Sequence, residues 1–309
     1  MDSEIRKKRK IEERKRKRRW RKKVFNTVKL VMVSIVLVCF VRFLVTQTGL
    51  LHHAGGLVNE ENVPAGYMER SDVSLQAPVA RTGSQLKEQM KKLAKKDSGY
   101  RKIYENYDAY PEQLLSALCS NPEMLSYVQG YLDARPLASG GFTGKEKRQQ
   151  LPLLIQWDKR WGYVPYGNSR IGMSGCAPTC LSMVLLALTG NTKATPDQVA
   201  EYAENAGYYQ EGTGTSWSLM TEGCEHFGIH GTEISLDENV IKQHLEKGEP
   251  IICSMRPGDF TTEGHFIVLA GEADGKIMVN EPNSRKRSRV LWDYDTLEPQ
   301  IKNLWAFSK

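Results

Sequence analysis

The most restrictive feature of the sequence is a helix-forming run that is apolar on nearly every side. It lies between Gly175 and Leu188 and reads GCAPTCLSMVLLAL, and Gly190 follows shortly after it. A helix that is apolar all round must be covered on all sides, and a glycine just past the last turn is typical of a helix end. The sequence therefore predicts a central buried helix with Cys176 at its N-terminus.

Periodicity and turn residues predict the elements on both sides of this helix. Before it, the pattern is helical from Ser84 to about Leu132, with one segment beginning near Pro111 and another running from Pro122 to Leu132. After it, we expect a helix that starts at Pro196 and is stopped by Gly207, helices at about 216–227 and 237–247, and strands at 250–255, 265–271, 276–281 and 304–307. Helices followed by an antiparallel sheet indicate an α+β fold.

The N-terminal part of the chain has a different character. Residues 1–23 hold 14 basic and 4 acidic side chains, and residues 24–46 are apolar from Leu30 to Val41 except for Ser34. As a helix, 24–46 would reach roughly 34 Å, enough to cross a hydrocarbon layer of about 30 Å. We expect a single membrane span, with the basic tail held in the cytoplasm and everything from about residue 48 outside.

Three alternatives apply to this N-terminal part. A buried soluble helix is disfavoured, because the stretch is apolar all round and follows the basic runs RKKRK and RKRKRRWRKK. A cleaved secretory signal would have a shorter apolar stretch and a small-residue cleavage site, and no such site follows Val45. The basic tail could also bind nucleic acid. The rest of the chain carries 29 basic and 32 acidic side chains, so its folded part has no basic field for nucleic acid.

The sequence divides into five regions on these grounds. They are a cytoplasmic tail (1–23), a transmembrane helix (24–46), a linker (47–83), a helical spacer (84–149) and a C-terminal domain (150–309). We expect the spacer to pack on the C-terminal domain, with substrate docking as its alternative role.

Cys176 is the first candidate for chemistry. The thiolate is the nucleophilic form of cysteine, and the partial positive charge of a helix N-terminus favours it. The free N–H groups there can also hold an oxyanion. The alternative is a small buried cysteine without a chemical role. Four other cysteines fall in apolar segments, and we expect them to be buried thiols: Cys119, Cys180, Cys224 and Cys253.

A base must accompany this thiol, and His265 is the best candidate. It alone among the six histidines follows a glycine and precedes an apolar strand. No spacing of histidines and cysteines suits zinc, so we expect no metal. Gln156 is a candidate side-chain donor to the oxyanion, with an ordinary surface glutamine as the alternative.

A third group should orient the imidazole. One turn register of the hairpin after His265 places Ile267 opposite Glu281 and His265 opposite Asn283. A two-residue turn would instead place Asn280 and Ser284 on the face of the histidine. The sequence leaves these alternatives open.

Three motifs carry a resemblance to a known family: IQWDKRWGYVPYG, SGCAPTCLSMVL and GHFIVLAGEADGKIMVNEPNS. Over roughly residues 150–309, the chain resembles the bacteriocin-processing cysteine peptidases, and more closely their stand-alone relatives without a transporter. The resemblance implies a papain-like fold with a cysteine nucleophile, a histidine base, an acidic or amide orienter and a glutamine in the oxyanion hole.

Two residues match that pattern and two depart from it. Cys176 matches the nucleophile and His265 the base. Glu281 occupies the place of a usual aspartate with one extra methylene, and Ala177 stands where glycine is usual. Gln156 lies 20 residues before the cysteine, farther than in the transporter-linked members.

The function implied is a membrane-anchored, extracytoplasmic cysteine peptidase that acts on peptide or protein substrates without a cofactor. Its other partner would be the lipid bilayer, through residues 24–46. The alternative is a papain-like scaffold at the cell surface that binds peptides without turnover. The loops at 212–217 and 256–264 could hold a ligand in either case.

Overall fold

The computed structural model describes residues 66–70 and 73–309. The predicted cytoplasmic tail and membrane segment, residues 1–46, lie outside the described residues. No helix within the described part combines the length and the apolar character that a membrane crossing needs.

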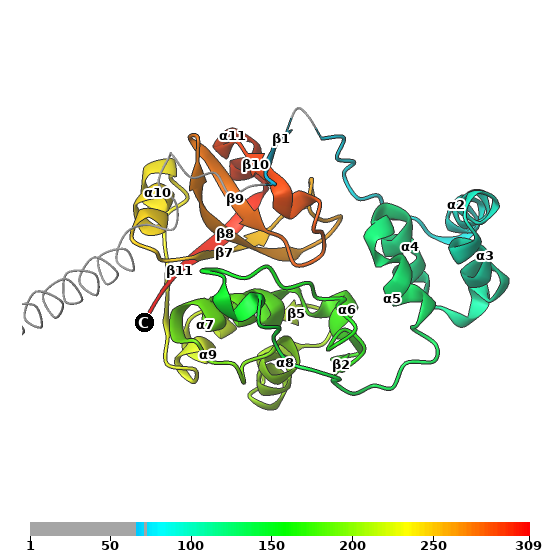
Figure 1. Ribbon diagram of the computed structural model, residues 1–309, viewed down its shortest axis with the longest axis horizontal. Coiled ribbons are helices and arrows are strands. Elements are labelled where there is room, and N and C mark those ends of the chain that lie inside the picture. The colour runs from blue at the N-terminus through cyan, green and yellow to red at the C-terminus, as the bar shows by residue number, and fades with distance from the viewer. Residues whose placement is uncertain (1–65, 71–72) are drawn as a thin grey trace, which may run out of the picture. The chain divides into compact units, whose positions relative to one another are not determined.

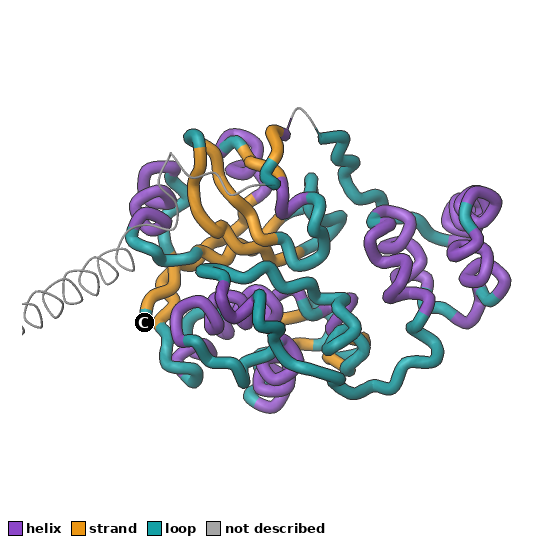
Figure 2. Tube along the Cα trace, in the orientation of Figure 1, coloured by secondary structure: helices purple, strands orange, loops and turns teal. Residues whose placement is uncertain are grey.

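A mixed sheet of seven strands forms the centre of the C-terminal part (Figures 1 and 2). Its strands are β1 (Met68–Glu69), β6 (His230–Glu233), β7 (Ile251–Met255), β8 (His265–Ala273), β9 (Lys276–Asn280), β10 (Val290–Trp292) and β11 (Ile301–Ser308). They lie in the order β1-β10-β9-β8-β7-β11-β6. Only β1 and β10 pair in parallel, and every other pair in this sheet is antiparallel. Two short hairpins accompany it: β2 (Pro165–Tyr166) with β3 (Ser169–Arg170), and β4 (Tyr209–Gln210) with β5 (Gly214–Thr215).

The central strand β8 is buried on both faces and supplies side chains to two cores. Phe266 and Val268 belong to the core that contains the long helix α7, whereas Ile267 and Leu269 belong to the core that contains α10. Because successive side chains of a strand point to opposite faces, one apolar run can serve both cores. The sheet is therefore covered by helices on both sides.

Helix α7 is the predicted central helix. Ten of its 14 residues are buried, and it ends at Gly190, which has a left-handed φ of 66°. The helices of this part are α6 (Ile171–Ser174), α7 (Cys176–Thr189), α8 (Pro196–Asn205), α9 (Glu222–Glu225), α10 (Glu238–Glu246) and α11 (Tyr294–Leu297). Short 3-10 turns are η4 (Glu146–Arg148), η5 (Trp217–Leu219), η6 (Arg287–Arg289) and η7 (Glu298–Gln300).

Residues 83–130 form what we call the helical unit. Its elements are α2 (Gly83–Lys96), α3 (Ser98–Glu105), η2 (Tyr107–Ala109), α4 (Glu112–Ser120), η3 (Pro122–Met124) and α5 (Leu125–Gln129). Its core includes Ile155, Trp157 and Tyr163 from the following segment. The Tyr127 and Tyr163 rings stack 4.7 Å apart, and the Tyr127 hydroxyl donates to the Gly162 carbonyl at 2.9 Å. The helical unit is therefore packed onto the rest of the described chain.

The mixed α+β arrangement is confirmed, and the strands predicted at 250–255, 265–271, 276–281 and 304–307 correspond to β7, β8, β9 and β11. The helix predicted at 216–227 is wrong, because η5 and the four-residue α9 replace it. Ser216 accepts a hydrogen bond from Ser218 N and starts a 3-10 turn, and Gly223 weakens any longer helix. The helix predicted from Pro122 to Leu132 ends earlier, at Gln129.

The stretch predicted as a linker also contains structure. Strand β1 lies within residues 47–83, and Val73 is 7 % exposed in the core of α10. Strands β1, β6 and β10 escape prediction because they have two to four residues each, too few to establish a period.

The central burial of α7 can be tested by shortening one of its side chains. Leu185 is fully buried, and we expect Leu185→Ala to lower the free energy of unfolding by about 3 kcal/mol, because the cavity left behind cannot close. Leu188 on the same helix is partly buried, and Leu188→Ala should cost at most about 1 kcal/mol. Urea denaturation followed by tryptophan fluorescence measures both, and equal losses would contradict this packing.

Candidate active site

Cys176 occupies the first position of α7 and is half-buried. The N–H groups of a first helical turn have no acceptor within the helix, and Pro178 in this turn has no N–H to satisfy. Gly175 precedes the cysteine at a point where the chain passes close to α6. A Cβ on Gly175 would lie 2.5 Å from Ile171 Cγ2 and 2.6 Å from its carbonyl oxygen. Only glycine therefore fits here, and it fixes how the chain enters α7.

His265 begins strand β8 and lies against Glu281, which follows strand β9. The His265 Nε2 atom is 2.6 Å from Glu281 Oε1, and the two side chains are 8 % and 0 % exposed. With Nε2 engaged by the carboxylate, Nδ1 is the ring nitrogen left for Cys176. Of the residues that the sequence left open as orienters, the structure thus joins Glu281 to the predicted histidine.

The β8–β9 hairpin explains why Glu281 reaches His265. Ala273 pairs with Lys276, so the turn has two residues, Asp274 and Gly275, both with positive φ (52° and 74°). The register then shifts by one residue between Leu269 and Gly271. Beyond this bulge, Val268 pairs with Asn280. Counting on, Glu281 comes opposite Ile267, on the same face as His265 two residues earlier.

The hairpin therefore combines the two alternatives left open by the sequence. Its turn is the two-residue one, yet the bulge restores the register that brings Glu281 near the histidine. Asn280 points elsewhere, since its amide donates to the Leu151 carbonyl at 3.3 Å. Asn283 contributes its backbone, because its N–H donates to Glu281 Oε1 at 2.7 Å.

Charges around the imidazole favour its protonated form. Burial alone would lower the pKa of His265, but the Cys176 thiolate and the Glu281 carboxylate outweigh burial and raise that pKa to about 10. Beyond the carboxylate, Arg287 Nη1 lies 4.0 Å from Glu281 Oε2. That oxygen is buried without a hydrogen-bond partner, so Arg287 supplies the nearest compensating charge.

Gln156 is buried rather than exposed and connects both halves of the site. Its backbone N–H donates to the Pro282 carbonyl at 2.8 Å, next to Glu281, and its side-chain Nε2 donates to the Gly172 carbonyl at 3.1 Å, just before Cys176. Its Oε1 atom is buried without a partner. An ordinary surface glutamine is therefore excluded, and the amide lies between the two segments that carry the thiol and the carboxylate.

The other described thiols differ from Cys176 in their surroundings. Burial raises the pKa of Cys119 to about 11, partly offset by Arg81, and burial raises that of Cys224 to about 11. Burial also raises the pKa values of Cys180 and Cys253 far above the usual range. Three of these four are buried as predicted, and Cys119 is half-buried. All four are held in the thiol form at neutral pH.

The two loops proposed as ligand contacts differ in exposure. Trp217, at the end of the 212–217 loop, is 39 % exposed and packs edge-to-face on buried Trp305. Phe260, in the 256–264 loop, is buried against Trp292. Only the first loop therefore offers an aromatic side chain to a ligand.

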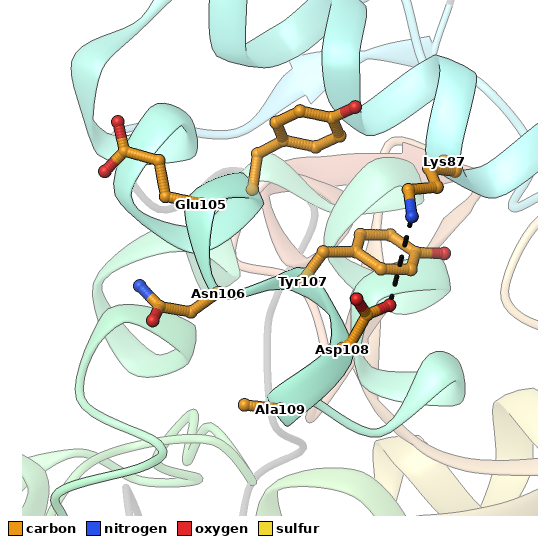
Figure 3. A pocket seen from close by; sticks show the side chains of 7 residues that line it. Lys87, Glu105, Asn106, Tyr107, Asp108 and Ala109 are labelled. Carbon is orange, nitrogen blue, oxygen red and sulfur yellow. Dashed lines mark ion pairs between the residues drawn. The ribbon is translucent and has the colours of Figure 1, made fainter.

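A pocket of about 240 Å³ lies in the helical unit, away from these residues (Figure 3). It is lined by Lys87, Tyr104, Glu105, Asn106, Tyr107, Asp108 and Ala109. Lys87 Nζ lies 4.0 Å from Asp108 Oδ1 and 5.2 Å from the centre of the Tyr107 ring. The lining contains no thiol and no imidazole, so this pocket has no part in the chemistry of Cys176.

Sequence reasoning missed the residues that hold the segment after Glu281. Asn121 and Glu123, at the start of η3, contact residues 283–286, more than 160 positions later in the chain. An asparagine before a proline is typical of a helix cap, and Asn121 does cap η3 by accepting from Glu123 N. No local pattern signals a contact between such distant positions.

The site consists of a thiol at the N-terminus of a buried helix beside an imidazole at the start of a sheet strand. This arrangement is typical of a class of cysteine peptidases. The model of the Peptidase_C39 like family matches residues 148–308, and the chain belongs to that family. This membership supports a cysteine peptidase of the C39-like class. No curated protein and no solved structure matches the chain.

The raised pKa of His265 predicts a specific pH dependence of stability. A group whose pKa is higher in the folded protein stabilises it fully below the unfolded pKa, about 6.5, and this stabilisation is lost as the pH rises toward about 10. We expect the unfolding midpoint of the wild-type protein to fall relative to that of His265→Gln over this range. Thermal unfolding of both proteins at several pH values measures the difference, and a constant difference would contradict the prediction.

Proposed function

We propose that this protein is a membrane-anchored cysteine peptidase that hydrolyses peptide bonds on the outer side of the membrane. The observation that carries the proposal is the buried His265–Glu281 pair, with His265 also within hydrogen-bond reach of Cys176 at the N-terminus of α7. A buried imidazole flanked by a carboxylate on one side and a thiol on the other suits nucleophilic catalysis. Membership in the Peptidase_C39 like family supports the same reaction class.

In the proposed mechanism, the Cys176 thiolate attacks the carbonyl carbon of a peptide bond. The protonated His265 gives its Nδ1 proton to the leaving amine, and a thioester to Cys176 remains. The neutral imidazole then takes a proton from water as the water attacks the thioester. The carboxylic acid leaves, and the thiolate and imidazolium are restored. Glu281 keeps the ring oriented through both steps without joining the bonds that change.

Backbone N–H groups at the start of α7 stabilise the oxyanion in this proposal, and Gln156 assists them. The buried position of its amide between Gly172 and Pro282 supports this role. Of its two amide hydrogens, one is used by the Gly172 carbonyl, which leaves the other for a substrate oxygen.

The proposed location on the membrane rests on the sequence alone. The tail of residues 1–23 and the apolar segment 24–46 support a single-pass anchor with its N-terminus in the cytoplasm. Peptide or protein substrates would then meet the enzyme outside the bilayer. A papain-like scaffold without turnover is the alternative that the following experiment addresses.

Substitutions at the site should separate the roles. Cys176→Ala and His265→Ala should each abolish cleavage of a defined peptide mixture, because nucleophile and base act as one unit. Gln156→Ala should lower kcat by roughly 10²-fold if its amide meets the oxyanion. Glu281→Gln should reduce cleavage less than Cys176→Ala or His265→Ala does. Mass spectrometry of the products provides the measurement, and Cys119→Ala serves as the matched cysteine control.

A result in which the wild-type protein binds these peptides but releases no products would favour the scaffold. Full activity of Cys176→Ala would exclude this thiol as the nucleophile.

The proposed topology can be tested on intact cells. Protease added from outside should remove the epitope of an antibody against residues 150–309, because that part of the chain is expected beyond the membrane. A cytoplasmic protein serves as the control for membrane integrity. Full protection of residues 150–309 in sealed cells, with digestion after permeabilisation, would overturn the topology.

A further inference from the structure

The segment that follows Glu281 is held by a carboxylate from the helical unit. Glu123 accepts three hydrogen bonds from this segment: from Ser284 Oγ at 2.6 Å, from Arg285 N at 3.0 Å and from Lys286 N at 3.1 Å. Consecutive backbone N–H groups of a turn form a concave site that favours an anion. Hydrogen bonds to an ionised acceptor are also the stronger ones. Glu123 therefore fixes the turn of residues 283–286.

Asn121 provides a second contact from the same element. Its side-chain Nδ2 donates to the Asn283 carbonyl at 2.5 Å, and Trp157 Nε1 donates to the same oxygen at 2.9 Å. The Oδ1 atom of Asn121 accepts from Glu123 N at 3.2 Å. The amide that caps η3 is thus also one of the donors that grip the turn, and it is only 6 % exposed.

The 283–286 turn also holds the Glu281 carboxylate. Asn283 N donates to Glu281 Oε1, the oxygen that also contacts His265. On the far side, Glu281 N donates to Ser288 Oγ at 2.8 Å, and that hydroxyl donates to the Ser284 carbonyl at 2.9 Å. A shift of residues 283–284 would therefore move both the backbone and the carboxylate of Glu281.

A different N-terminal segment approaches the same turn. Lys286 Nζ donates to the Ser74 carbonyl at 2.7 Å, and Arg287 Nη2 donates to the Gln76 carbonyl at 2.9 Å. These residues precede the helical unit in the chain. Two separate stretches outside the family match of 148–308 thus converge on one short turn next to the site.

From these contacts we propose that the helical unit completes the active site. Asn121 and Glu123 are positioning residues that hold the 283–286 turn and, through it, keep Glu281 against His265. This inference rests on the proposed function of Cys176 and His265. The helical unit is then more than a spacer, because the orientation of the imidazole depends on it.

The rate at which iodoacetamide alkylates Cys176 tests whether the helical unit positions Glu281, and it requires no knowledge of the substrate. The groups that face His265 are Cys176 from α7 and Glu281, with Arg287 behind the carboxylate. The proposed mechanism requires a thiolate–imidazolium pair, and displacement of Glu281 should disfavour its imidazolium and slow alkylation at about pH 6. At about pH 10 an ordinary thiol, with a pKa of about 8.5, is ionised in any case. A positioning defect should therefore appear at the lower pH only.

The isosteric variants Glu123→Gln and Asn121→Asp are the test proteins, in the full chain. Asn121→Asp keeps the cap but removes the donor to Asn283. Each should lower the alkylation rate at about pH 6 by roughly tenfold, within the roughly 10²-fold that a misplacement of 1 Å can cost, and change it less than about twofold at about pH 10. Glu88→Gln removes the same charge as Glu123→Gln at an exposed position of α2, so it is the matched control for that variant and should behave as wild type.

A double substitution identifies the route of the effect. If Glu123 acts through Glu281, adding Glu123→Gln to Glu281→Gln should cause no further loss at about pH 6. Independent, multiplicative losses would overturn the inference. Wild-type rates in both test variants, or equal losses at both pH values, would also overturn it and leave the helical unit with a packing role.

Failure of the proposed function gives a different result. The first measurement compares wild type with His265→Ala at about pH 6. Equal Cys176 rates would show that no thiolate–imidazolium pair exists, and would overturn the proposed function together with this inference. A slower His265→Ala combined with unaffected Glu123→Gln and Asn121→Asp would overturn the inference alone.

Discussion

A carboxylate that has no access to water is the constraint on which the rest of the site depends. Glu281 is fully buried, and removing a charge from water costs several kcal/mol unless other groups compensate it. Its Oε1 atom is compensated by His265 and by the Asn283 N–H, and Arg287 lies nearest to Oε2. Such a group cannot move freely, because each alternative position would leave charge or donors unpaired. The buried carboxylate thus fixes the position of the imidazole, which in turn lies beside the thiol of Cys176.

The fold brings these groups together through two features of different origin. The bulge in β8 sets the register that places Glu281 and His265 on one face of the hairpin. Gly175 sets the start of α7 and thereby the place of Cys176. The first feature belongs to the sheet and the second to the helical layer. Gln156 is hydrogen bonded to both layers, through the Pro282 carbonyl after β9 and the Gly172 carbonyl before α7. The geometry of the site therefore depends on how these two layers pack, which the apolar side chains of β8 and α7 determine.

The sequence predicts the parts of this arrangement that local physics controls. The all-round apolar run ending at Gly190 predicts α7 well, and a glycine followed by an apolar run predicts the position of His265 at a strand start. Whether Glu281 or Asn280 meets the histidine depends on a bulge near Ala270, and one residue of register changes the face of every side chain. The helix predicted at 216–227 fails for a local reason, since the turn begun by Ser216 ends as the short 3-10 element η5 and Gly223 lowers the helix propensity of the segment that follows. Contacts of Asn121 and Glu123 with the 283–286 turn are tertiary, and no periodicity encodes them.

The glutamate at position 281 fits this geometry for a reason that also explains its supports. Glu281 is a diagonal neighbour of His265 rather than its direct partner, and diagonal positions across an antiparallel pair lie farther apart than direct ones. An aspartate there would be shorter by one carbon–carbon bond, roughly 1.5 Å. The longer side chain reaches the ring but has one more rotatable bond, so ordering it costs more conformational entropy. Hydrogen bonds from Asn283 N to the carboxylate, and from the turn to Glu123, restrict that freedom from outside. The extra methylene therefore lets the carboxylate reach a distant imidazole, and the contacts of the helical unit hold that longer side chain in place.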